Sequence, residues 1–351
     1  MRHLSLDYFR VLCTLIVVFI HSMTLDTSDI YANGSPPEQC ALCCLGVIFS
    51  ISVPGFVLLS GAFNLNRLIP NARDFYVSAL KKIGIYYLLF LIINFSVYKV
   101  AIPIYIGQTV DIKNAFYKCI LKGHAGVEWF IPMIFGLYLL TPLILKIKER
   151  VSACAFWWIT VAVLCSTHLT LEPLLDLFNC DLPAYFLSPL YLGLYMLGGC
   201  MFRCYKICNT SVQPKHVIFL FIFLFIAIVI KLTSILQFAD ALPIGIVDSR
   251  SQIALIMSSI LFLVFLYIKL PDSIIITRIS KISLLIYLTH PLCIIGQTLL
   301  TNYLGFKLTT SNFIYQFIWS SFAILISVLM ASVLDIIISS FNTRISAMRE
   351  K

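Results

Sequence analysis

Charged residues are scarce in this chain of 351 residues: they make up 12% of it, whereas about a quarter of a soluble globular domain is charged. Hydrophobic residues make up 60%, and the mean hydropathy is +0.96. Apolar stretches of the roughly 20 residues needed to cross a bilayer core recur along the whole chain. This composition excludes an ordinary soluble core and predicts an all-α, polytopic membrane protein whose single membrane-embedded domain spans residues 1–351.

Long polar segments are also missing, and no internal repeat is present. None of the connections between apolar stretches is long enough to fold as a separate domain. We expect about ten transmembrane helices, at residues 8–26, 40–62, 83–102, 126–145, 154–169, 185–202, 216–238, 251–268, 282–300 and 313–340. Any functional site must therefore be built from these helices and their ends.

The excess of basic residues follows this expected topology. With the N-terminus placed inside, the 25 Lys and Arg residues divide into 18 on the inner side and 7 on the outer side. This asymmetry predicts that both termini are cytoplasmic, and it explains the net charge of +9 without any nucleic-acid partner. No small-residue cleavage site follows the first apolar segment, so we expect a retained helix there and not a signal peptide.

The twelve cysteines lack the paired spacing, often completed by histidine, that zinc sites use. Most of them lie in or beside expected helices, where cysteine packs as a small apolar residue. No metal site is predicted.

The first helix carries an unusual polar stripe in the segment LDYFRVLCTLIVVFIH, residues 6–21. Asp7, Arg10 and His21 share one helical face, because eleven residues make close to three full turns, and Arg10 and His21 are separated by roughly 16 Å along the axis. A charged face is costly in lipid, so it should face the bundle interior or a wet cavity. The alternative is that Arg10 reaches the inner headgroups and His21 lies at the interface.

Two further helices contain proline beside polar or small residues. The second carries Pro54 and the pair Ser60-Gly61 in SVPGFVLLSGAF, for which ordinary helix packing is an alternative explanation. The ninth contains ISLLIYLTHPL, and Ser283, Tyr287, His290 and Gln297 form one polar stripe along it. The proline after His290 leaves a backbone carbonyl without its helical donor. His290 should therefore line the bundle interior, either as a hydrogen-bonded structural residue or, with His21, beside a reaction chamber where imidazole could transfer protons.

At these residues the chain resembles the acyltransferase-3 family of integral membrane enzymes. The resemblance lies in five segments, which are residues 6–21, SVPGFVLLSGAF, LKKIGIYYLLF, VEWFIPMIFGLYLLTPLI and ISKISLLIYLTHPL. Within that family, the length and the lack of an attached extracellular domain are similar to the stand-alone O-acetyltransferases of surface polysaccharides, such as that of enterobacterial common antigen.

The resemblance implies a donor and a reaction. The donor would be acyl-CoA, most often acetyl-CoA, entering from the cytoplasm as a cosubstrate, with no bound cofactor. His21 would act as general base, while His290 and Tyr287 would line the chamber and stabilise the developing oxyanion. A covalent acyl-enzyme is the open alternative.

The donor-binding residues implied by the resemblance are Arg10, oriented by Asp7, with Ser60 and Gly61 shaping the channel and Lys81 and Lys82 near the CoA phosphates.

The acceptor implied by the resemblance is a hydroxyl of a cell-surface glycan or of its lipid-linked precursor, and the location is the bacterial inner membrane. The family often has histidine two residues before the tryptophan, where this chain has Val127. Glu128 and Trp129 are the candidates on the acceptor side, although both also suit the membrane interface.

A multi-pass transporter or flippase of a lipid-linked sugar is the alternative function. Lys231 and the proline-interrupted helices agree with it, but the paired halves of many transporters are missing.

Overall fold

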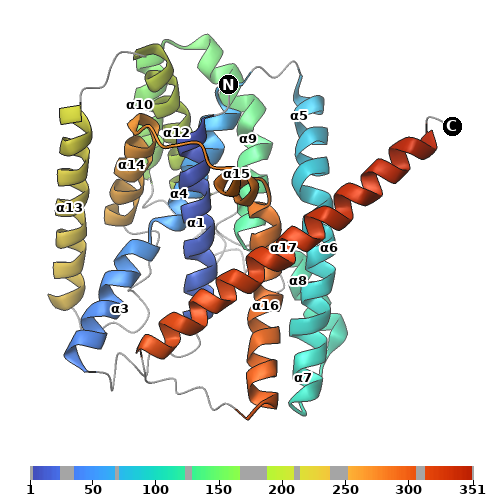
Figure 1. Cartoon of the computed structure of the whole chain (residues 1–351). Coiled ribbons are helices and arrows are strands. Elements are labelled where there is room, and N and C mark those ends of the chain that lie inside the picture. The colour runs from blue at the N-terminus through green and yellow to red at the C-terminus, as the bar shows by residue number, and fades with distance from the viewer. Residues whose placement is uncertain are drawn as a thin grey trace. The chain divides into compact units, whose positions relative to one another are not determined.

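The structure is a computed structural model that describes residues 3–23, 35–67, 71–122, 129–166, 188–208, 214–237, 252–305 and 313–349 (Figure 1). Within these ranges every regular element is a helix. The prediction of an all-α membrane protein is therefore confirmed.

Six helical segments in the described ranges are long and apolar enough to cross a membrane: Leu4–Met23, Pro36–Asn64, Ala72–Tyr105, Phe130–Arg150, Ser283–Tyr303 and Phe313–Ser340. Three shorter apolar helices are Ala153–Cys165, Ile218–Ile230 and Ile253–Tyr267. The count of ten spans, the single domain and the cytoplasmic position of both termini stay predictions.

The chain divides into two compact units, and the first joins its two ends: residues Met1–Ser52, Ile226–Asp248 and Lys269–Lys351. Its helices are α1 (Leu4–Met23), α3 (Pro36–Phe49), α15 (Ile274–Lys281), α16 (Ser283–Tyr303) and α17 (Phe313–Arg349). Helix α1 packs against α15, α16 and α17, and α17 crosses α1 and α16 obliquely (Figure 1).

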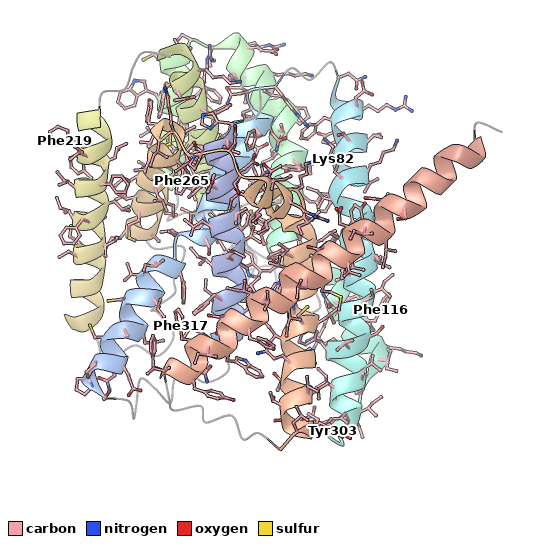
Figure 2. The ribbon with its side chains drawn as sticks, in the orientation of Figure 1. Lys82, Phe116, Phe219, Phe265, Tyr303 and Phe317 are labelled. Carbon is pink, nitrogen blue, oxygen red and sulfur yellow. The ribbon has the colours of Figure 1, made fainter. Side chains whose placement is uncertain are left out.

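Helix α1 is buried on most of its surface because three helices surround it. Leu6, Phe9, Cys13 and Val18 have no exposed surface. Near the end of α1, the ring of Phe19 lies 5.2 Å from the ring of Phe317, which is labelled in Figure 2. The apolar contacts hold α1 in a fixed rotation, so its polar residues also face the interior of this unit.

The second unit comprises residues Val53–Phe225 and Ser249–Ile268. Its helices are α4 (Ser52–Asn64), α5 (Ala72–Ala79), η1 (Leu80–Gly84), α6 (Ile85–Phe95), η2 (Ser96–Ala101), α7 (Ile102–Tyr105), α8 (Ile112–Lys122), α9 (Phe130–Arg150), α10 (Ala153–Cys165), α12 (Pro189–Cys208) and α14 (Gln252–Tyr267). Helix α13 (Pro214–Gln237) contributes residues to both units.

The second expected span does not form one continuous helix. It is interrupted at Ser50 and Ile51, between α3 and α4. Pro54 lies in the first turn of α4, where proline is tolerated because its missing N–H would have no intrahelical partner there. The proline thus marks the start of a new helix.

Candidate functional site

A charged cluster forms where α1 meets α15 in the first unit. Ser280 Oγ donates a hydrogen bond to Asp7 Oδ1 at 2.6 Å, and Arg10 Nη1 donates to Ser280 Oγ at 3.0 Å. Arg10 Nη1 also lies 3.4 Å from Asp7 Oδ1. Asp7 and Ser280 are buried, whereas the Arg10 side chain stays 29% exposed. The buried pair thus holds a guanidinium whose remaining surface is accessible.

The two intramembrane histidines are in direct contact, although 269 residues separate them in the sequence. His21 Nδ1 lies 2.7 Å from His290 Nε2, and the two rings are nearly parallel, with an interplanar angle of 14°. His290 has no exposed surface, and His21 is partly exposed. The structure therefore brings together the polar stripes that the sequence places on two separate helices.

Pro291 explains the position of the His290 ring. Proline has no N–H, so the carbonyl of Tyr287, four residues earlier, loses its helical donor. His290 Nδ1 lies 2.6 Å from this carbonyl oxygen and replaces the missing donor. A buried carbonyl without a partner would cost about 1–3 kcal/mol, so this contact stabilises the helix at Pro291 and fixes the orientation of the His290 ring.

These contacts determine the protonation of the neutral pair. A carbonyl oxygen only accepts, so His290 Nδ1 carries the proton and His290 Nε2 is an acceptor. His21 Nδ1 must then donate to His290 Nε2, which leaves the lone pair of His21 on Nε2. This arrangement can accept a proton at His21 Nε2 and share the resulting charge with His290, as an oriented general base requires.

Tyr287 lies against the pair, with its ring centroid 5.6 Å from that of His290. Its backbone takes part in the hydrogen-bonded chain described above. The predicted role of its side chain with a developing oxyanion stays a prediction.

The other predicted donor-binding residues lie in the second unit. Gly61 packs against α12, where an added Cβ would lie 1.8 Å from the backbone oxygen of Tyr195, and Ser60 beside it is half-buried. This is the close helix contact that the sequence allowed as an alternative. Lys81 and Lys82 are both exposed on the π-helical segment η1, and Figure 2 labels Lys82.

The predicted acceptor residues are described only in part. Trp129 directly precedes α9, and its ring lies 6.1 Å from that of Tyr191. Glu128 lies outside the described residues, and so does the side chain of Lys231.

The sequence pattern did not identify Ser280 as a site residue. The polar stripe predicted along α16 cannot be extended back to Ser280. The helix is interrupted at Ile282, and Ser280 belongs to the separate short helix α15. The signal available was a small polar residue just before a proline-containing helix, which is too common to identify a partner on α1.

The comparison with protein families matches residues 3–334 to the acyltransferase-3 family, described as an acyltransferase domain. No curated protein and no solved structure matches the chain. The matched range covers nearly the whole sequence and includes both histidines and the Asp7–Ser280–Arg10 cluster. The chain belongs to the acyltransferase-3 family, and it is a multi-pass membrane acyltransferase.

Proposed function

We propose that this protein transfers an acyl group, acetyl in the first instance, from acyl-CoA to a hydroxyl of a cell-surface glycan or its lipid-linked precursor in the bacterial inner membrane. Family membership supports acyl transfer to a hydroxyl. The observation that carries the proposal is the contact of His21 with His290, because it provides a base with a defined proton-accepting nitrogen inside an apolar unit.

In the proposed reaction, the acceptor hydroxyl gives its proton to His21 Nε2 as its oxygen attacks the thioester carbonyl carbon. The tetrahedral intermediate then collapses, the carbon–sulfur bond breaks, and the protonated His21 returns the proton to the departing sulfur. The products are an ester and the free thiol of CoA, so atoms and charge balance. His290 acts as a positioning residue, since its Nε2 accepts from His21 Nδ1 and holds the imidazole in the reactive tautomer.

The donor would bind at the opposite end of the polar stripe. Arg10 is suited to phosphate because guanidinium presents two donors to an oxyanion, and Asp7 and Ser280 hold it from the buried side. The roughly 16 Å of helical rise from Arg10 to His21 suits the extended pantetheine arm of CoA. The roles that the resemblance implies for the other residues are also part of the proposal: Lys81, Lys82, Ser60 and Gly61 in donor binding, and Glu128 and Trp129 on the acceptor side.

The test uses membranes that contain the full-length protein, incubated with acetyl-CoA labelled in the acetyl group and with surface glycan whose own esters have been removed by mild base. We expect label to enter the glycan as a base-labile ester. His21→Ala should reduce the rate by about 10²-fold or more, which is the usual contribution of a general base.

Protein amount and thermal midpoint should be measured beside the rate, with Thr298→Ala as a matched control. Thr298 is half-buried on α16 and bonds only its own helix among the contacts described. Label transfer by His21→Ala at the wild-type rate would remove His21 from the mechanism. Movement of glycan without any ester formation would instead identify a carrier.

A further inference from the structure

The short helix α15 is attached to the first turns of α1. The Tyr8 hydroxyl donates to the backbone carbonyl of Pro271 at 3.0 Å, shortly before α15 begins. Ser280, in the last turn of α15, is hydrogen-bonded to both Asp7 and Arg10. These α1 residues lie in the first two turns of a helix that is about as long as a bilayer core is thick. The contacts therefore place α15 at the level where the apolar core of the membrane meets the lipid headgroups.

The two faces of α15 differ in their exposure. Ser280 is buried on the side that packs on α1. On the other side, Ile274 and Ile275 are 84% and 66% exposed, and Arg278 and Lys281 are exposed as well. Steps of three and four residues bring these four side chains onto one side of a helix. Ile274, Ile275, Arg278 and Lys281 thus make up an exposed face of α15, directed away from α1.

The apolar half of this face is unusual for a helix in water. Ile274 has the largest exposed fraction of any leucine, isoleucine or valine in the described ranges, and a second isoleucine follows it directly. Removing such side chains from water is favourable. A helix that lies at a membrane surface does so by burying its apolar residues at the boundary between headgroups and acyl chains. The position of α15 at that level gives the two isoleucines this environment.

The other half of the exposed face is basic. The segment from residue 269 to residue 281 contains Lys269, Arg278 and Lys281 against the single carboxylate of Asp272. Within the part of the chain that the structure describes, neither Arg278 nor Lys281 is paired with a carboxylate. Basic segments next to a membrane span are attracted to anionic lipids, and the long stems of Arg and Lys let their charged ends reach the headgroups.

We propose that the exposed face of α15 binds an anionic phospholipid. Ile274 and Ile275 insert between the acyl chains, and Arg278 and Lys281 bind the phosphate of the headgroup. The lipid thereby restrains α15 at the membrane surface, together with Ser280, which holds Arg10 from the opposite face. This lipid contact is independent of the proposed reaction.

The test uses the full-length protein in nanodiscs of phosphatidylcholine that contain a trace of a photoreactive lipid, either phosphatidylglycerol or phosphatidylcholine. Both probes carry a diazirine at the same position of the acyl chain. After illumination, mass spectrometry of the digested protein quantifies the cross-links to the peptide that contains α15. The variant combines Arg278→Gln with Lys281→Gln. Its matched control is Arg150→Gln, which removes an exposed basic side chain at the end of α9.

In the wild-type protein we expect both probes to cross-link to α15, because the isoleucines contact acyl chains. Phosphatidylglycerol should give about fivefold more cross-links, which is the attraction of one basic residue for an anionic lipid surface. The double variant should give equal yields from the two probes, whereas Arg150→Gln should keep the wild-type ratio. The thermal midpoints should be unchanged, because all three substituted side chains are exposed.

Three results would each overturn the proposed lipid contact. A protein cross-linked on its membrane spans but not on α15 would have the exposed face in water. Equal yields from the two probes in the wild type would remove the recognition of an anionic headgroup. Loss of the cross-links on addition of excess acetyl-CoA would assign Arg278 and Lys281 to the phosphates of the donor. None of these results bears on the proposed acyl transfer, which label transfer tests separately.

Discussion

At the scale of single residues, His290 determines which nitrogen of His21 is basic. Its Nε2 accepts from His21 Nδ1, and its own Nδ1 is anchored on the Tyr287 carbonyl. His290→Leu should lower kcat about 10²-fold or more, because His21 then loses the acceptor that holds its tautomer. His290→Gln should retain much of the activity, since its Oε1 can occupy the place of Nε2. Steady-state kinetics of label transfer check both variants.

A structural role alone would affect the two His290 variants in another way. Both lose the bond to the Tyr287 carbonyl, so both should lose similar stability, which the thermal midpoint measures. Equal loss of kcat in the two variants would therefore contradict the positioning role. A selective recovery of kcat in His290→Gln, with the KM for acetyl-CoA unchanged in both, agrees with it.

Ser280 is the residue that joins Asp7 to Arg10. Ser280→Ala removes the hydrogen bonds at 2.6 and 3.0 Å, so the guanidinium becomes less well oriented. We expect the KM for acetyl-CoA to rise about three- to tenfold, while kcat is unchanged because the histidine pair lies elsewhere. Ser283→Ala, at a half-buried serine three residues later on α16, is the control. A lower kcat with an unchanged KM in Ser280→Ala would contradict this role.

The sequence predicted residues that share a helix better than residues that meet across helices. Periodicity placed Asp7, Arg10 and His21 on one face, and the structure has all three in α1 directed to partners in its own unit. The contact of His21 with His290 could not be derived in the same way, because it depends on how α1 and α16 pack. Ser280 was missed for this reason, since a single serine carries no periodic signal.

At the scale of elements, hydropathy located most helices to within a few residues. The expected spans 251–268 and 282–300 correspond to Gln252–Tyr267 and Ser283–Tyr303. The ends and interruptions of the helices were predicted less well. The expected helix 83–102 lies within a longer helical segment, Ala72–Tyr105, which contains two π-helical stretches. The first turns of this segment are polar, so hydropathy does not identify them as part of a membrane helix. Asn71 caps them by accepting a hydrogen bond from the Asp74 N–H.

The crossing of α4 with α12 depends on glycine. A Cβ at Gly61 would lie 1.8 Å from the backbone oxygen of Tyr195, and backbone cannot move away as a side-chain end can. Gly61→Ala should therefore separate the two helices and destabilise the protein by about 1–3 kcal/mol, measured as a lower thermal midpoint in detergent.

Gly296→Ala is the matched control for this substitution. Gly296 lies inside α16, and no neighbouring atom lies within 4 Å of the position that a Cβ would take there. Alanine is the better helix former at such a site, so the midpoint should stay or rise. An unchanged midpoint in Gly61→Ala would show that the two helices approach less closely than the structure has them.

At the scale of the whole molecule, the proposed catalytic groups come from opposite ends of the chain. The first unit combines residues Met1–Ser52 with Lys269–Lys351, and α1 and α16 run in the same direction within it (Figure 1). Parallel neighbours are what the predicted topology requires, because the first and ninth of ten spans cross the membrane in the same sense. The order of the apolar stretches predicts that α1 and α16 run in the same direction. That these two helices pack against each other depends on tertiary structure.

The direction in which α1 crosses the membrane determines on which side Arg10 lies. If acyl-CoA, a cytoplasmic molecule, is the donor as proposed, the cluster of Arg10, Asp7 and Ser280 lies at the cytoplasmic end of α1, which the distribution of basic residues also predicts. Green fluorescent protein exported through the general secretion pathway does not fluoresce, and fusions therefore report the side of the membrane. A fusion after Lys351 should fluoresce, and so should one after Val151. A fusion after Asp111, in the expected outer loop, should be dark but accumulate to the same level. The reverse pattern would place Arg10 outside the cell, out of reach of acyl-CoA, and would contradict the proposed donor site.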